Sequence, residues 1–269
     1  RRLVSAAADG TARVWDVALT GPPRILRHPG AIRIAVFHPD GRRVATGAQD
    51  GEVRVWPVDG DAPPSMHHGH TGEVVALAFH PEGEALLSAS LDGTTRVWPR
   101  KPGQKDRVLR GHAGRVYSAQ WSPDGDRIVT ASQDGTARVW PAQGGAARVL
   151  RGHAEELGAA GFDPGGDHVV TAGRDGSVRV WQVRGSGEEV PVLRPGGRPT
   201  LLAWTPDGAH LLSGRSDGVI QLWKPDTPSS PRRLAESGPT PLWLGADDRD
   251  ARHRGELLAG AGDRRERLV

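Results

Sequence analysis

Six tryptophans return at a nearly constant interval along the chain. The intervals between successive members are 41, 42, 42, 41 and 42 residues. An internal repeat of this length indicates an array of similar supersecondary units, and it has to be recognised first because it decides the fold. The tryptophans are Trp15, Trp56, Trp98, Trp140, Trp181 and Trp223.

Two turns recur within every period. An Asp-Gly pair lies six residues before each tryptophan, and a serine or threonine lies four residues before the aspartate. Asp-Gly between β-rich runs is a strong hairpin signal, because both residues tolerate the backbone angles of a tight turn. A second turn, such as Ser122-Pro123-Asp124-Gly125, lies further upstream and has proline where type I turns favour it. Each period therefore predicts four short strands, the content of one propeller blade.

The segment between the two turns is mostly apolar at consecutive positions, as in residues 128–132 and 169–173. Such a run is typical of a strand with both faces buried, which stacking of neighbouring blades requires. A degenerate seventh copy follows at residues 257–263 and puts Val269 where a tryptophan would stand. The chain begins inside a repeat, so we expect the first blade to lack its outer and innermost strands.

These signals resemble the WD40 repeat family. The Gly-His pair, the Asp-Gly turn and the closing tryptophan recur over nearly the whole chain, although only Trp15-Asp16 keeps the literal Trp-Asp dipeptide. The resemblance implies an all-β, seven-bladed β-propeller with four-stranded antiparallel blades, the first incomplete at the N-terminus and the last degenerate. Residues 1–269 would form this single domain, a fragment of a larger protein, with repeats ending near the six tryptophans and Val269.

Composition limits the function classes. The chain has no cysteine, which excludes disulfides and thiolate metal sites and allows the cytoplasmic location that we expect. No apolar run is long enough to span a membrane. All but three of the 35 basic residues are arginines, but they are scattered, and three Phe and one Tyr offer little base stacking, which disfavours nucleic acid. The arginine-rich composition is typical of a GC-rich bacterial genome.

Four repeats combine a histidine with a hydroxyl residue, an aspartate and a tryptophan. One interpretation is a hydrolase triad. The WD40 resemblance implies a structural hydrogen-bond network instead, and the number of copies favours it, because an active site occurs once. The four sets are His28-Thr46-Asp50-Trp56, His70-Ser88-Asp92-Trp98, His112-Thr130-Asp134-Trp140 and His153-Thr171-Asp175-Trp181.

The remaining polar motifs predict no cofactor. Pro195 takes the histidine position of the sixth repeat, so we expect that blade to be looser. In the cluster His67-His68-Gly69-His70 no cysteine or carboxylate completes a metal site at a familiar spacing. The glycine pairs are turn signals rather than a phosphate-binding motif. We therefore expect no metal, no cofactor and no catalytic residue.

The WD40 resemblance implies that partners bind on the face that carries the turn aspartates. Its arginines favour an acidic or phosphorylated protein or peptide partner, and Arg and Tyr often dominate binding energy. The predicted contact residues are Arg33, Gln49, Glu73, Leu91, Arg115, Tyr117, Gln133, Glu156, Arg174 and Arg198.

The predicted function is a non-catalytic scaffold or sensor for protein binding. The resemblance further implies a place in a larger bacterial signalling protein, covalently linked to neighbouring domains such as a kinase or an NTPase. The alternative is a propeller hydrolase with a site on loops near the central channel. That alternative needs a cluster that breaks the repeat, and the candidates are Asp247, Asp248, Asp250 and His253.

Overall fold

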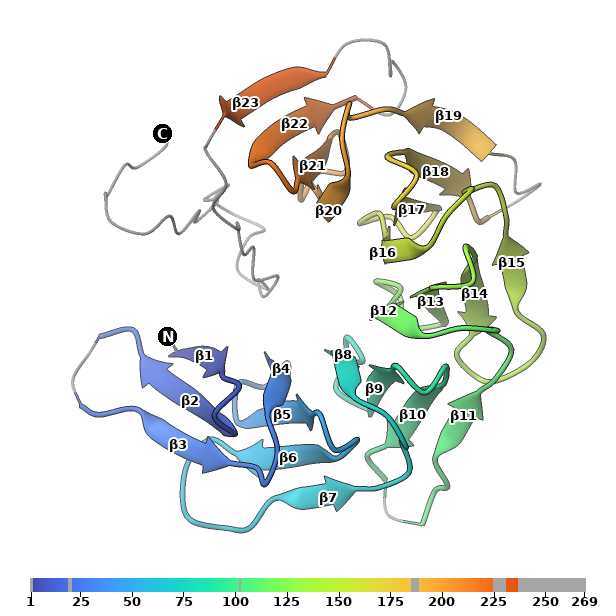
Figure 1. The fold of residues 1–269 in the computed structure, drawn as a ribbon. Coiled ribbons are helices and arrows are strands. Elements are labelled where there is room, and N and C mark those ends of the chain that lie inside the picture. Colours follow the sequence, from blue (N-terminus) through green and yellow to red (C-terminus); the bar gives the residue numbers. More distant parts are fainter. Residues whose placement is uncertain (1, 19–20, 102, 185–188, 225–230, 237–269) are drawn as a thin grey trace.

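The fold consists of short antiparallel β-sheets arranged around a common centre (Figure 1). The computed structural model describes residues 2–18, 21–101, 103–184, 189–224 and 231–236, and these hold 23 strands and no helix. The Asp-Gly turns form as expected, because their glycines adopt the positive φ that such turns require, for example 83° at Gly93. The all-β prediction is confirmed.

Six sheets are present in the described residues, each built from consecutive strands. The first sheet contains β1 (Arg2–Ala6), β2 (Thr11–Asp16) and β3 (Arg24–Arg27). The other five have four strands each: β4 (Ile32–Phe37), β5 (Arg43–Ala48), β6 (Val53–Pro57) and β7 (Ser65–His67); β8 (Val74–Phe79), β9 (Ala85–Ser90), β10 (Thr95–Pro99) and β11 (Arg107–Leu109); β12 (Val116–Trp121), β13 (Arg127–Ser132), β14 (Ala137–Pro141) and β15 (Arg148–Leu150); β16 (Leu157–Phe162), β17 (His168–Gly173), β18 (Val178–Gln182) and β19 (Glu189–Leu193); β20 (Pro199–Trp204), β21 (Leu211–Arg215), β22 (Val219–Trp223) and β23 (Arg232–Glu236).

Each four-stranded sheet is one blade, with its first strand nearest the centre of the ring and its last strand outside (Figure 1). The outer strand follows the repeat's tryptophan, so a blade takes it from the start of the next sequence repeat. For this reason β3 fills the outer position of the first sheet, which lacks only an innermost strand among the described residues. The expectation that its outer strand is also missing is wrong. The predicted seventh copy lies outside the described residues.

The second strand of each four-stranded sheet forms the core. In β9, β13 and β17 the last five residues are all buried, which agrees with the consecutive apolar pattern of the sequence. Side chains of one blade pack on the next: Leu87 of β9 shares a buried cluster with Trp121 of β12 and Ile128 of β13. Burial of each such aliphatic side chain contributes about 1.5 to 3 kcal/mol, so the stacking of blades stabilises the fold.

Each innermost strand carries a bulge at its start. The pairing register shifts between Val116 and Ser118 in β12, and equivalent shifts occur in β4, β8, β16 and β20. A bulge leaves one extra residue unpaired and redirects its side chain. The residues between the shifted pairs are Arg33, Val75, Tyr117, Gly158 and Thr200.

Candidate functional site

The Asp-Gly turns lie on the same face as the loops that lead into the innermost strands. Backbone hydrogen bonds fix this arrangement: the Leu91 amide donates to the Glu73 carbonyl at 2.9 Å, and the Gln133 amide donates to the Arg115 carbonyl at 2.8 Å. The two groups of predicted contact residues are thus neighbours within each blade. We call this surface the turn face, defined by the turns at residues 49–51, 91–93, 133–135, 174–176 and 216–218.

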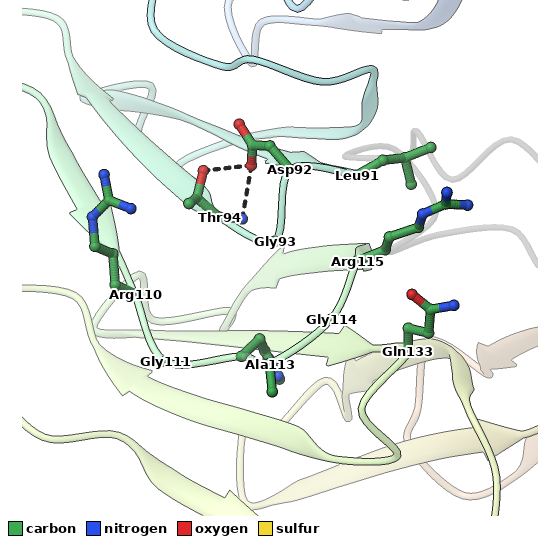
Figure 2. Close-up of a pocket in the computed structure, with 11 residues that line it drawn as sticks. Leu91, Asp92, Gly93, Thr94, Arg110, Gly111, Ala113, Gly114, Arg115 and Gln133 are labelled. Atoms are coloured by element: carbon green, nitrogen blue, oxygen red, sulfur yellow. Dashed lines mark hydrogen bonds between the residues drawn. The ribbon is translucent and has the colours of Figure 1, made fainter.

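Two hollows open on the turn face between successive blades. The first has a volume of about 370 Å³ and is lined by residues 91–94, residues 110–115 and Gln133. In Figure 2, Arg110 stands on one side of it, and Leu91, Arg115 and Gln133 lie across from it. The second, of about 380 Å³, is lined by residues 133–135, residues 153–156 and Arg174. Gln133 belongs to both, so the hollows are adjacent.

Glu156 collects the polar contacts of the second hollow. It accepts hydrogen bonds from the Tyr117 hydroxyl at 3.4 Å and from the Gln133 amide group at 3.3 Å, both on the preceding blade. It also pairs with Arg174 of its own blade at 3.3 Å. The bulge at Tyr117 turns its ring toward this neighbour. Glu156 therefore couples two blades on the predicted binding face.

The other predicted contact residues differ in how their charge is balanced. Arg33 pairs with Glu73 of the next blade at 2.7 Å. Arg115 and Arg198 are exposed and make no ion pair with the residues that the structure describes. Gln49 is exposed at its turn and lines neither hollow. The two hollows thus bring Leu91, Arg115, Gln133, Glu156 and Arg174 together. Tyr117 joins them through Glu156, and Glu73 through its backbone contact with Leu91. Arg33, Gln49 and Arg198 line neither hollow.

Three of the predicted four-residue networks are closed by hydrogen bonds. His70 Nδ1 donates to Asp92 Oδ2 at 2.9 Å, its Nε2 accepts from the Ser88 hydroxyl at 2.8 Å, and Trp98 Nε1 donates to the same oxygen at 2.8 Å. The same contacts, at 2.7 to 3.1 Å, join His112, Thr130, Asp134 and Trp140, and His153, Thr171, Asp175 and Trp181.

The electrostatics of these networks suit a structural role. Burial alone would raise the pKa of Asp134, but hydrogen bonds from the Thr136 hydroxyl, the Ala113 amide and His112 outweigh it and lower the pKa to about 2. Burial lowers the pKa of His112, so a neutral imidazole faces a carboxylate. The central Thr130 hydroxyl is completely buried. A nucleophile has to be reached by substrate, which this oxygen cannot be.

The fourth predicted network, in the blade of β4 to β7, is not complete. His28 Nε2 contacts Thr46 Oγ1 at 2.7 Å, and Trp56 Nε1 donates to the same oxygen at 2.8 Å. His28 Nδ1, however, is buried without a hydrogen-bond partner, and Asp50 does not reach it. The expectation of an intact His-Asp link in this blade is wrong, because Pro29 follows His28 and has no amide hydrogen. In the three closed networks the equivalent amides of Thr71, Ala113 and Ala154 anchor the aspartate.

An arginine two residues before the tryptophan supports the networks, and the sequence interpretation missed it. Arg96 lies 5.4 Å from the Trp98 ring centre and donates to the Gly69 carbonyl at 2.7 Å. The signal was present, because Arg-x-Trp recurs in five of the six repeats with a tryptophan. Part of the arginine excess is therefore structural. The five are Arg13, Arg54, Arg96, Arg138 and Arg179.

The blade of β20 to β23 replaces its histidine contact with an arginine. Arg215 donates to the carbonyl of Pro195 at 3.0 Å and pairs with Asp217. Trp223 Nε1 still donates to the Ser213 hydroxyl at 2.8 Å. The sequence identified Pro195 as the break but did not identify Arg215 as the group that spans it.

The alternative site at Asp247, Asp248, Asp250 and His253 lies outside the described residues. Within the described part of the chain, no helix has the length and apolar character that a membrane span requires.

The fold and the turn face define a β-propeller built from a repeated four-stranded blade. Five segments match the family described as WD domain, G-beta repeat, at residues 22–57, 63–99, 103–141, 144–182 and 200–224, which together cover more than half of the chain. The chain therefore belongs to the WD40 repeat family. WD40 repeats generally mediate protein-protein interactions, and propellers of this type are typically non-catalytic. No curated protein matches the chain significantly.

Proposed function

We propose that this propeller binds an acidic or phosphorylated segment of a partner protein on its turn face and catalyses no reaction. The first hollow is the observation that carries the proposal. Arg110 and Arg115 are both exposed and line it from opposite sides. The two exposed side chains extend from opposite rims of the hollow (Figure 2), and both could turn toward a carboxylate or a phosphate bound between them, which accepts charged hydrogen bonds from both.

Among the described residues, Asp92 is the one carboxylate that lines this hollow, and it does not neutralise the charges of Arg110 and Arg115. Asp92 is already engaged by the Thr94 hydroxyl at 2.7 Å, the Thr71 amide at 3.0 Å and His70. Its negative charge therefore serves the network within its own blade. Neither Arg110 nor Arg115 has an ion-pair partner in the part of the chain that the structure describes.

The second hollow has a different charge. Glu155 and Glu156 line it beside Arg174, and Arg174 is paired with Glu156. An anionic group would therefore prefer the first hollow, while a neutral or basic part of the same partner would lie over the second. This difference would fix the direction of an extended peptide across the two hollows.

The proposal is tested with immobilised peptides of one sequence that carry phosphoserine, glutamate, serine or lysine at the central position. The wild-type chain should retain the phosphoserine and glutamate peptides. The double charge reversal Arg110→Glu, Arg115→Glu should lose both, by at least tenfold in Kd, because paired arginine contacts to a charged group contribute about 1.5 to 3 kcal/mol each.

The matched control is Arg100→Glu, Lys101→Glu, which makes the same change in net charge at exposed residues just after β10, away from the turn face. The control should bind as the wild type does. Equal retention of the anionic peptides by both double variants would contradict the proposal. The cytoplasmic location and the role in signalling stay predictions.

A further inference from the structure

The blade of β4 to β7 contains a cluster of three metal-ligating side chains outside the two hollows. One ligand atom each from His28, Asp50 and Glu52 lies within 4.8 Å of the others. His28 is 7% exposed, and its Nδ1 is buried without a hydrogen-bond partner. Asp50 is exposed and Glu52 is half-buried, so the cluster opens to solvent on the carboxylate side.

Two sequence changes set this cluster apart from the three closed networks. Glu52 stands where the other blades have the hydroxyl of Thr94, Thr136 or Ser177, which donates to the turn aspartate at 2.7 Å. Pro29 stands where they have an amide that donates to the same aspartate. Asp50 therefore loses both anchors and its bond to His28. In exchange, the blade gains a second carboxylate.

The hydrogen-bond partners of His28 leave its Nδ1 lone pair free to bind an ion. Nε2 lies 2.7 Å from Thr46 Oγ1, and the Thr46 hydroxyl lies 3.4 Å from the Arg54 carbonyl, to which it donates. In the tautomer that carries its proton on Nε2, the ring donates to Thr46 and Nδ1 has a free lone pair. The hydrogen bond of the other ring nitrogen thus fixes the orientation of the imidazole, as second-shell partners do for metal-binding histidines.

We propose that His28 Nδ1, Asp50 and Glu52 bind a divalent first-row transition-metal ion such as Zn²⁺. One imidazole nitrogen and two carboxylate oxygens form a ligand set of the kind zinc accepts, whereas Mg²⁺ and Ca²⁺ prefer oxygen ligands alone. Ligand atoms about 2.1 Å from a tetrahedral ion lie about 3.4 Å apart, so the two carboxylates have to turn inward toward His28. The remaining coordination position faces solvent.

Arg54 reduces the negative charge of the site without blocking it. Its guanidinium contacts Glu52 Oε2 at 2.6 and 3.0 Å, while Glu52 Oε1 has a longer contact, of 3.7 Å, with Nδ1 of the exposed His68. With a neutral His28, two carboxylates and one arginine, the site keeps a net charge of −1. A divalent ion is attracted to this charge, and the ion gives the buried Nδ1 of His28 the partner that it lacks.

The test is a titration of the full chain, first stripped with a chelator, with Zn²⁺ and separately with Co²⁺. The wild type should bind one equivalent that Glu52→Gln binds at least tenfold more weakly, since even loss of an outer-shell partner costs 10- to 100-fold in metal affinity. Co²⁺ should give visible d-d absorption bands with the wild type. The same equivalent of Zn²⁺ should raise the Tm of the wild type and leave that of Glu52→Gln unchanged.

Glu84→Gln is the matched control, because Glu84 is exposed in the turn before β9, and it should bind Zn²⁺ like the wild type. Tryptophan fluorescence checks that each variant is folded. Equal Zn²⁺ affinity of the wild type and Glu52→Gln, or binding of Ca²⁺ or Mg²⁺ more tightly than Zn²⁺, would overturn the proposal. Glu52→Thr gives this blade the type of residue that its neighbours have at this position. It is a second variant that should no longer bind the Zn²⁺ ion.

Discussion

One hydroxyl oxygen at the centre of a blade serves two buried nitrogen atoms. Thr130 Oγ1 accepts from Trp140 Nε1 at 2.9 Å and contacts His112 Nε2 at 2.7 Å. Strand pairing explains the spacing, because Thr130 lies opposite Arg138 and therefore diagonal to Trp140. Loss of this oxygen would leave both nitrogens buried without a hydrogen-bond partner, and such unsatisfied groups lower the free energy of unfolding.

Replacement of Thr130 by valine should lower the free energy of unfolding by about 1 to 3 kcal/mol, since the shape is kept and two polar groups lose their partner. Urea denaturation measures this change in the free energy of unfolding. Ser5→Ala is the control: Ser5 accepts from Trp15 Nε1 at 3.0 Å, but the contact is exposed. Water can replace that bond, so the control should change stability by less than about 0.5 kcal/mol. Equal losses in the two variants would contradict this account.

His28 should make stability depend on pH. Its pKa is lowered to about 4 in the folded chain, whereas an unfolded histidine titrates near 6.5. Between these values the unfolded chain binds one more proton, so the stabilisation is complete above about pH 6.5 and is lost as the pH falls toward 4. In metal-free buffer, His28→Gln should reduce the slope of unfolding free energy against pH, between pH 6 and 5, by up to about 1.4 kcal/mol per unit. An unchanged slope would contradict the prediction.

The blades differ in how their loops are anchored to their strands. In the blade of β12 to β15, His112 links the loop before β12 to β13 and to the turn aspartate. In the blade of β20 to β23, Arg215 makes this link instead: it donates to the Pro195 carbonyl in the loop before β20 and pairs with the exposed Asp217 in the turn. The second arrangement leaves the Ser213 hydroxyl with the tryptophan as its single described side-chain partner.

Amide hydrogen exchange should therefore be faster in β21 than in β13. Both strands occupy the same position in their blades and are buried, so the comparison isolates the loop anchor. Exchange followed by mass spectrometry, on peptides that cover Leu211–Arg215 and Arg127–Ser132, provides the measurement. Exchange in β21 that is as slow as in β13, or slower, would show that Arg215 replaces the histidine fully.

Neighbouring blades also meet at the end of the ring opposite the turn face. Gly125, with φ of 76°, lies against the imidazole of His80 from the preceding blade, and a Cβ there would overlap that ring. The ring cannot move freely, because it packs edge-on against Trp121 at 4.9 Å. Gly41 occupies the same turn position with φ of 68° and has no atom within 4 Å of its Cβ position.

Gly125→Ala should therefore destabilise the propeller more than Gly41→Ala. Both substitutions carry the strain of a positive φ, about 1 to 2 kcal/mol, but only the first adds an overpacked contact between blades, which costs about 1 to 3 kcal/mol more. Thermal unfolding of the two variants gives the difference. A Tm for Gly125→Ala equal to or above that of Gly41→Ala would contradict an interlocked contact at His80.

The blades and their buried strands could be predicted from the repeat period, the turns and the apolar segments between the turns, because strand pairing and turn geometry depend on residues close together in the sequence. The sequence did not show that His28 Nδ1 stays unpartnered, since that depends on where Pro29 and Glu52 lie relative to Asp50 in space. It also gave no measure of the charge balance on the turn face. Whether Arg115 is free and Arg174 paired depends on side chains from neighbouring blades.

The shared strands have a mechanical consequence. Because the outer strand of each blade belongs covalently to the following repeat, the boundary between repeats in the sequence falls inside a sheet rather than between sheets. A pulling force applied along the chain cannot remove one repeat without tearing a strand from the previous blade. Unravelling should then proceed in steps that each damage two neighbouring sheets.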